Sequence, residues 1–274
     1  MKSLVIYAVT YNSYACLENY LASLDVSCKA VEENFICEVI VVDNSTQKEK
    51  ITYFPTFYSL TTLPMKENLG YFPSLHEVMK THPPLQADYV IISNVDMLYE
   101  ETTIPKLLQA EISERVGWIV PMIMSQTKGY NLNPQAAFRY SLKRLKLLRF
   151  AFKYPIVHYV YTKTFHKRKK FRSEQPKGCV YAGHGSFLIL TKSYFEKAGV
   201  IAYPNFLYGE ELYLAEENLR HELDVVYLPE IRVDDIGKVS TGQLKSKDYY
   251  NYNYTGLDYI IKNYYKVVDY GQVL

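Results

Sequence analysis

The sequence lacks several features that would assign it to a large functional class at once. No apolar run approaches the ~20 residues that a membrane-spanning helix needs, and no small-residue cleavage pattern follows the first apolar stretch. The four cysteines form no C-x-x-C pair, and no histidine stands at zinc-ligand spacing. We therefore expect a cytoplasmic protein with reduced, mostly buried thiols and no structural zinc site.

Glycine-rich phosphate loops are also missing. No G-x-G-x-x-G follows the first apolar run, which argues against a dinucleotide bound in the Rossmann manner. Gly237-Lys238 lacks both the upstream glycine and the following Ser or Thr of a P-loop. The 274 residues are 48% hydrophobic and 22% charged, which is typical of a globular chain, and we expect one domain over 1–274.

The net charge hides an uneven distribution. The formal total is only +2, which by itself gives no reason to expect a polyanionic partner. Yet the stretch from Lys143 to Arg172 contains eleven Lys and Arg and no acidic residue. Subtracting these eleven charges leaves the rest of the chain at about −9. The sequence therefore predicts a basic insert, at about 125–176, on an acidic body.

Short apolar runs alternate with helical patterns in the first half, which is the order of a parallel sheet with helices on its faces. Expected strands lie at 4–9, 38–42, 89–93 and 118–122, with a weaker one at 58–62, and helices at 14–24, 73–81 and 104–113. After the insert we expect a strand at 186–191, a helix beginning near Lys192, an acidic helix at 210–222, a strand at 225–228 and a Tyr-rich helical tail at about 245–274. The predicted fold class is α/β, with a mostly parallel sheet.

Polar residues follow three of these strands, in Thr10-Tyr11-Asn12-Ser13, Asp43-Asn44-Ser45 and Ser93-Asn94-Val95-Asp96. Singly, each is an ordinary turn or helix cap. Together they stand where open parallel sheets bind ligands. Sugar transfer from a nucleotide needs a carboxylate for the nucleoside, a hard oxygen ligand for a divalent metal, and a base for the acceptor hydroxyl. The sequence can supply all three.

Six motifs, in order, resemble the family-2 glycosyltransferases, most closely their rhamnosyltransferase-like branch. They are Val9-Thr10-Tyr11-Asn12, Val41-Val42-Asp43-Asn44-Ser45, Asn68-Leu69-Gly70-Tyr71, Asn94-x-Asp96, Gly185-Ser186-Phe187 and Tyr208-Gly209-Glu210-Glu211. The resemblance runs from Val5 to about Ser240 and skips the basic insert. It implies a GT-A nucleotide-diphospho-sugar transferase fold and an inverting hexosyl or rhamnosyl transfer, as in bacterial polysaccharide or lipid-linked glycan assembly.

The resemblance also implies roles for individual residues. It assigns nucleotide-sugar binding to Thr10, Asn12, Asp43, Asn68, Gly70, Asn94 and Asp96. Asp96 would also bind Mg²⁺ or Mn²⁺, whose charge stabilises the leaving diphosphate. Within the acidic pair Glu210-Glu211, the second member would be the base. Carboxylates placed side by side have raised pKa values, which suits proton abstraction; alternatively, they only stabilise the start of an acidic helix.

The sequence departs from the family at two places. Phe72-Pro73-Ser74 replaces the small residues that often follow the Asn-x-Gly turn, which puts donor contacts of that loop in doubt. Asp235 stands where the family often has a metal-binding His. A carboxylate is the better ligand for Mg²⁺ or Mn²⁺. Asp235 therefore either preserves the metal site or marks one that binds metal weakly or not at all.

The basic insert begins with an amphipathic pattern. Leu142, Leu145, Leu148 and Phe152 fall near helical spacing with Lys and Arg between them. Such a segment can lie on an anionic membrane, which suits a lipid-linked acceptor and a peripheral location at the inner face of the plasma membrane. The alternative is a core-packed helix with a solvated basic face.

Two other functions remain possible from the sequence. A nucleic-acid-binding module would use the basic segment with its interleaved aromatics, but it leaves the strand-end acids unexplained, so we expect no nucleic acid partner. A catalytically inactive relative would keep the fold and lose the transfer. The expected partners are thus a nucleotide-diphospho-sugar donor and a glycan or lipid-linked acceptor.

Overall fold

The computed structural model describes residues 1–84, 86–159, 176–237 and 245–265. The second half of the basic insert, the end of the Tyr-rich tail and the last residues of the family resemblance lie outside these ranges.

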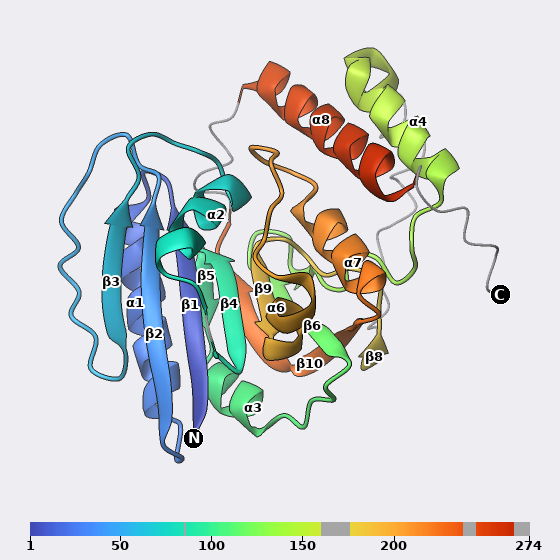
Figure 1. The fold of residues 1–274 in the computed structure, drawn as a ribbon. Helices are drawn as coiled ribbons and strands as arrows, with labels where there is room; N and C mark the ends of the chain where they lie inside the picture. Colours follow the sequence, from blue (N-terminus) through green and yellow to red (C-terminus); the bar gives the residue numbers. More distant parts are fainter. Residues whose placement is uncertain (85, 160–175, 238–244, 266–274) are drawn as a thin grey trace.

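One sheet runs through the whole molecule (Figure 1). Its main strands are β1 (Lys2–Thr10), β2 (Phe35–Asp43), β3 (Ser59–Pro64), β4 (Tyr89–Asn94), β5 (Met97–Tyr99), β6 (Val116–Ser125), β9 (Phe187–Thr191) and β10 (Asp224–Asp235). They follow the order β3-β2-β1-β4-β9-β6-β10-β5, and the two-residue strands β7 (Tyr130–Asn131) and β8 (Gly178–Cys179) pair with β6 and β10. Six of these ten strands run in one direction, and β5, β7, β8 and β9 run in the opposite direction, which agrees with the expected mostly parallel sheet.

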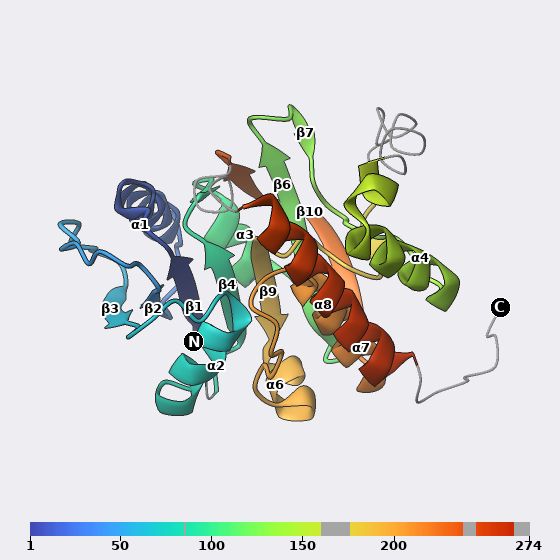
Figure 2. The ribbon, with the colours of Figure 1, turned by 90° about the horizontal axis from the view of Figure 1, so that it is seen from above.

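Helices cover both faces of the sheet (Figure 2). On one face lie α1 (Tyr14–Lys29) and α3 (Thr103–Gln109); on the other lie α2 (Phe72–Thr81), α6 (Lys192–Ala198), α7 (Glu210–Arg220) and α8 (Ser246–Tyr264). Each face has its own hydrophobic core. In β2, Val39 and Val41 are buried in the core under α1 and α3, and Ile40 and Val42 are buried in the core on the opposite face. Burial on both faces explains why the strands read as continuous apolar runs. None of the helices in the described ranges is long and apolar enough to cross a membrane.

The main differences from the expected elements lie near strand ends. Helix α3 stops at Gln109 because Ala110 adopts an extended conformation, so the expected extension to residue 113 is wrong. Strand β10 continues beyond the expected residue 228 to Asp235, across an irregularity in its pairing with β6. The short strand β5 follows β4 after a turn at Val95 and Asp96 and pairs with the end of β10.

The cysteines are all free, as expected, but not all are buried. Cys28 and Cys37 are buried, and the hydrogen bond that the Cys37 thiol makes to Cys28, followed by burial, raises the pKa of Cys37 well above its usual value. Cys16 is half-buried and Cys179, on the short strand β8, is exposed. The expectation of mostly buried thiols is therefore wrong for Cys179.

Helix α4 (Leu142–Lys153) forms in the basic insert and packs along α8. Its inner side consists of the four apolar residues that the sequence singled out: Leu145 is fully buried, and Leu142, Leu148 and Phe152 pack against the core. This packing agrees with the second interpretation of the sequence pattern, a core-packed helix with a solvated basic face. The apolar stripe expected to face a membrane faces the protein instead, because the apolar side of α8 lies beside it.

The acidic helix α7 is largely buried rather than solvated. The side chain of Glu216 is only 2% exposed, and Arg139 binds it with two hydrogen bonds of 2.9 and 2.7 Å. The hydroxyl of Tyr181 donates a third, at 2.5 Å. Glu217 accepts a 2.6 Å hydrogen bond from Tyr264 of α8. Buried carboxylates require such partners, so these contacts fix the sides of α7 against the insert and against α8.

Removing Arg139 would leave the buried Glu216 without its countercharge. We expect Arg139→Ala to lower the free energy of unfolding by about 3 kcal/mol, as for other broken buried ion pairs, measured by urea denaturation. The control is Lys80→Ala, which breaks an exposed pair with Glu77 and should cost less than about 0.5 kcal/mol. Equal losses in the two variants would contradict this account of the buried pair.

Candidate active site

The candidate site lies at one edge of the sheet, where β1, β2, β4 and β10 end. Thr10 pairs in register with Asp43, and Val9 with Asn94. Because β9 runs the other way, it begins at this edge, and the backbone N–H of Asn94 donates to the carbonyl of Ser186 at 3.0 Å. The strand directions thus bring together residues that are far apart in the sequence.

Asp43 is almost completely buried, at 3% exposed, and its carboxylate is surrounded by donors. The hydroxyl of Tyr14 donates to Oδ2 at 2.7 Å, and the backbone N–H of Ser45 donates to Oδ1 at 2.9 Å. The ammonium of Lys48 lies 3.5 Å from Oδ2. Burial and the contact with Asp43 raise the pKa of Tyr14, so this phenol stays protonated as a donor. Asp43 therefore organises the loop after β2; its contact with a nucleoside stays a prediction.

Asn12 joins the loop after β1 to the loop after β2. Its backbone N–H donates to the hydroxyl of Ser45 at 2.8 Å, and its side-chain oxygen accepts from the backbone N–H of Thr46 at 3.0 Å. Its φ of +50° is uncommon for a residue other than glycine. These bonds bring the polar ends of β1 and β2 into one structure, as the sequence predicts.

The Asn68-Leu69-Gly70-Tyr71 turn is held by Asn44, a residue to which the sequence gave no role. The side-chain NH₂ of Asn44 donates to the carbonyl of Gly70 at 3.0 Å and to the hydroxyl of Ser74 at 3.1 Å. Asn68 accepts from the N–H of Gly70 at 2.9 Å. A Cβ on Gly70 would lie 2.2 Å from the carbonyl oxygen of Phe206. Ser74, part of the departure from the family, thus has a structural role here.

Asp96 and Asp235 lie on adjoining backbone segments. The register places Asp235 opposite Met97, and the N–H of Ile236 donates to the carbonyl of Asp96 at 3.1 Å. One carboxylate oxygen of Asp235 accepts from the N–H of Gly237 at 2.9 Å. No group of three or more His, Cys, Asp or Glu gathers for a metal within the ranges that the structure describes. Two carboxylates nevertheless fit Mg²⁺ or Mn²⁺, because such ions take one or two protein carboxylates together with phosphate oxygens.

Glu210 and Glu211 form the first turn of α7, directly after Gly209, whose φ is +94°. Glu210 is 5% exposed, and burial, followed by the charge of Glu211, raises its pKa to about 8. Glu211 is half-buried, and burial raises its pKa as well. One oxygen of Glu211 lies 3.6 Å from the position that a Cβ on Gly185 would occupy. The carboxylate of Glu211 thus faces the loop that leads into β9.

Three buried polar atoms near this edge have no hydrogen-bond partner among the described residues: Oγ1 of Thr10, the hydroxyl of Tyr71 and Oε1 of Glu210. Burial raises the pKa of Tyr71 most, and the charges of Glu210 and Asp96 raise it further. Tyr71 therefore lies within electrostatic reach of both parts of the predicted site. Polar atoms without partners are costly when buried, and such atoms suit contact with a polar ligand.

His184 is another residue at this edge that the sequence did not single out. Its Nδ1 lies 2.8 Å from the hydroxyl of Ser186 and accepts from the N–H of Ser186 at 3.3 Å. The only signals for Tyr71 and His184 were their places at the end of one motif and directly before another. The position of Tyr71 does not reveal that its side chain lies within electrostatic reach of Glu210 and Asp96, and that of His184 does not reveal its contact with Ser186.

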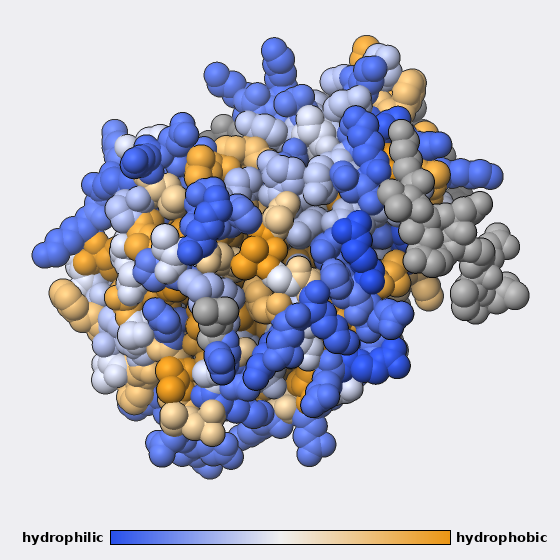
Figure 3. Space-filling view, in the orientation of Figure 1, coloured by the Kyte–Doolittle hydropathy of each residue, from blue (hydrophilic) through white to orange (hydrophobic). Residues whose placement is uncertain are grey.

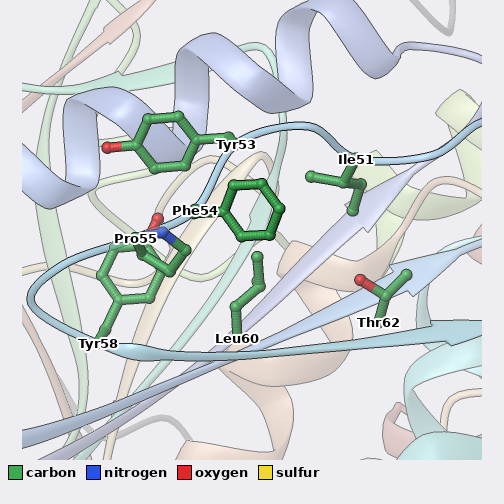
Figure 4. A pocket seen from close by; sticks show the side chains of 7 residues that line it. All are labelled: Ile51, Tyr53, Phe54, Pro55, Tyr58, Leu60 and Thr62. Atoms are coloured by element: carbon green, nitrogen blue, oxygen red, sulfur yellow. The ribbon is translucent and has the colours of Figure 1, made fainter.

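A pocket visible in Figure 4 lies in a different part of the molecule. It is lined by side chains of the β2–β3 connection and of β3: Ile51, Tyr53, Phe54, Pro55, Tyr58, Leu60 and Thr62. It contains neither a carboxylate nor any of the residues that the sequence assigned to the site. We therefore place the candidate site at the strand ends and not in this pocket.

Comparison with known proteins supports the fold assignment. No family model and no curated protein matches the sequence. Among solved structures, the crystal structure of GalNAc-T7 with UDP, GalNAc and Mn²⁺ has a TM-score of 0.58 at 10% identity and covers 96% of this chain but 48% of its own. TarS of S. aureus, residues 1–349, has a TM-score of 0.51 at 10% identity, with 95% and 72% covered. The chain spans about half of the first structure. Its fold is that of the GT-A glycosyltransferases, as expected; the rhamnosyltransferase-like branch stays a prediction.

The raised pKa of Glu210 predicts a pH-dependent stability. Its folded pKa of about 8 lies above the unfolded value, so the native state binds this proton more tightly, and the resulting stability is lost as the pH rises from about 5 to 8. Relative to the native chain, Glu210→Gln should gain stability across this window by roughly 1.4 kcal/mol per pKa unit. Urea denaturation from pH 5 to 9 measures this gain. The exposed substitution Glu77→Gln is the control, and parallel pH profiles for native and Glu210→Gln proteins would rule the account out.

Proposed function

We propose that this chain is a metal-dependent glycosyltransferase that moves a sugar, with inversion, from a nucleotide-diphospho-sugar to an acceptor hydroxyl. One observation carries the proposal. A single edge of a GT-A sheet holds three sets of carboxylates: Asp43 at the end of β2, Asp96 with Asp235 near the ends of β4 and β10, and Glu210 with Glu211 at the start of α7. The crystal structure of GalNAc-T7 with UDP, GalNAc and Mn²⁺ supports this kind of donor and metal.

The donor nucleoside would occupy the region between the ends of β1 and β2. Thr10 and Asn12 lie there, and Oγ1 of Thr10 is buried without a hydrogen-bond partner in the described ranges. Asp43 provides a fixed negative charge, and its donors Tyr14 and Ser45 restrict its orientation. Asn94 follows on the next strand and would contact the ribose. Asn68 and Gly70 would shape the loop along the donor rather than bind it through side chains.

The divalent metal, Mg²⁺ or Mn²⁺, would be held by Asp96 and Asp235 together with the donor diphosphate. When bound, such an ion stabilises the negative charge that develops on the leaving nucleoside diphosphate. Asp235 replaces the family's histidine by an oxygen ligand, which keeps the protein ligands hard. The N–H of Gly237 donates to one of its oxygens, and none of the described residues donates a hydrogen bond to the second.

Glu211 is the better base of the acidic pair. Glu210 is nearly inaccessible and, with a pKa of about 8, largely retains its proton at neutral pH. A protonated Glu210 adds no negative charge beside the diphosphate, so Glu211 can remain ionised. Glu211 faces Gly185, which carries no side chain of its own beside the carboxylate. It would accept the proton of the acceptor hydroxyl as that oxygen attacks the sugar from the side opposite the diphosphate.

The finer assignments follow from the resemblance of the sequence. We propose a hexosyl or rhamnosyl donor, a glycan or lipid-linked acceptor, and a place in bacterial polysaccharide and cell-envelope assembly. We propose no nucleic acid substrate, because the carboxylates at the strand ends would repel a polyphosphate backbone.

Nucleotide binding tests the donor part of the proposal. At about 100-fold excess over Kd, a preferred nucleoside diphosphate should add about 2.7 kcal/mol of stability, or roughly 5–10 °C in Tm. Thermal melts with UDP, dTDP and GDP, each with and without Mn²⁺, should show one preferred base and a larger shift with metal. Asp96→Asn should lose the metal-dependent part, whereas Asp224→Asn, at the other end of β10, should keep it. No shift with any nucleotide would refute the donor assignment.

Transfer activity tests the assignment of Glu211. We expect Glu211→Gln to reduce transfer to acceptor by about 100-fold or more while the nucleotide-induced Tm shift stays as in the native chain. Measuring released nucleoside diphosphate with and without acceptor gives the rate. Full activity in Glu211→Gln would remove it as the base. Nucleotide binding by a native chain that never transfers sugar would instead favour the inactive relative.

A further inference from the structure

The outer side of α4 exposes apolar side chains that the sequence pattern did not single out. Leu147 and Phe150 are each 51% exposed, Tyr154 is 46% exposed, and Ile156, just after the helix, is 81% exposed. Positions 147, 150 and 154 are three and four residues apart, so they lie on one side of the helix. This side is opposite the stripe that packs on α8. Helix α4 is therefore apolar on both sides, and the described part of the chain covers only one of them.

Lysines lie on the same outer side. Lys143, Lys146 and Lys153 are exposed and continue the spacing of three and four residues. We call these three lysines and the four exposed apolar residues the outer face of α4. In Figure 3, orange residues lie among blue ones in the upper right, where α4 is placed. No acidic residue occurs between Ser125 and Arg172, so no carboxylate of this segment balances the lysines.

The arginines of α4 are used differently. Arg149 forms a 2.6 Å ion pair with Asp258 of α8. The guanidinium of Arg144 lies 4.0 Å from the ring centre of Tyr140. A surface that binds nucleic acid would use arginines on phosphates, and it would have no use for exposed Leu and Ile side chains. Lysines bordering aliphatic and aromatic side chains instead match an anionic lipid surface, in which apolar groups enter the acyl boundary and ammonium groups meet headgroups.

Aromatic contacts connect α4 to the candidate site. The ring of Phe152, on the inner side of α4, lies 6.0 Å from that of Tyr249 of α8. Tyr249 in turn lies 5.3 Å from Tyr208, two residues before Glu210. Between the outer face and the loop that holds the acidic pair lie helix α4 itself and the aromatic rings of Phe152, Tyr249 and Tyr208.

We propose that the outer face of α4 docks this protein on an anionic membrane surface, with Leu147, Phe150, Tyr154 and Ile156 entering the interface and the three lysines contacting lipid headgroups. Docking would place the candidate site beside the bilayer, where a lipid-linked acceptor presents its hydroxyl. The acceptor part rests on the proposed function; the docking does not.

Vesicle co-sedimentation of the full chain tests the proposal. The native protein should bind vesicles of equal parts phosphatidylcholine and phosphatidylglycerol and should bind pure phosphatidylcholine much more weakly. Changing Lys143, Lys146 and Lys153 together to Gln should weaken binding by about fivefold per lysine, or about 100-fold in all. The pair Phe150→Ser and Ile156→Ser should weaken it by about tenfold or more. Tm should stay unchanged, because these side chains are exposed.

Matched controls separate the outer face from general surface effects. Lys29, Lys50 and Lys197, which are exposed elsewhere, are changed together to Gln and alter the net charge equally. Phe54→Ser removes a side chain that is 81% exposed in the β2–β3 connection. Both controls should bind vesicles like the native chain.

Equal losses in the controls would overturn the proposal, as would full vesicle binding by the Phe150→Ser, Ile156→Ser protein. Tighter binding of a short oligonucleotide than of vesicles, insensitive to the apolar pair, would overturn it by assigning the lysines to nucleic acid. Failure of the proposed function is detected separately, because nucleotide-induced stabilisation in solution requires no vesicle.

Discussion

The direction of the strands is the constraint on which the candidate site depends. Residues that follow β1, β2, β4 and β10 can meet only because these strands all end at the same edge of one sheet. The reversed strand β9 contributes from its beginning, so Ser186 joins Asn94 and Gly185 comes to face Glu211. A ligand at this edge would contact five segments that the sequence separates widely. Binding sites beyond the carboxyl ends of strands follow from this geometry in open α/β sheets generally.

The position of the acidic pair depends further on glycines that allow close backbone contacts. A Cβ on Gly256 of α8 would lie 2.6 Å from the carbonyl oxygen of Tyr208, and one on Gly70 would lie 2.2 Å from that of Phe206. The loop before α7 is therefore held between the Asn-x-Gly turn on one side and the C-terminal helix on the other. This arrangement buries Glu210 and so raises its pKa. The Tyr-rich tail, which had no chemical interpretation from its sequence, thus supports the site.

The sequence predicted the parts of the fold that periodicity encodes. Continuous apolar runs identified the long strands, because residues such as Val41 and Val42 are buried on opposite faces. It could not predict β5 or the extension of β10, since both depend on pairing between distant segments. The positions of the polar motifs directly after expected strands indicated the edge of the sheet where Asp43 and Asp96 lie. The roles of Asn44 and Tyr71 required three-dimensional contacts, and the acidic pattern of α7 concealed buried partners that lie in the insert and in α8.

The arginines and the lysines of the basic insert have different surroundings. Arg139 and Arg149 point toward the body and pair with Glu216 and Asp258, which holds the insert in place. A planar guanidinium loses less on leaving water and binds a carboxylate through two bonds, so arginine suits such half-buried pairs. The exposed lysines of α4 keep their hydration and remain available at the surface. Part of the acidic body is therefore neutralised internally by the insert, and Lys143, Lys146 and Lys153 of α4 lie exposed on the same side as Leu147 and Phe150. A helix that is bound to the body through one side and exposes lysines on the other has the electrostatic asymmetry that a peripheral membrane contact requires.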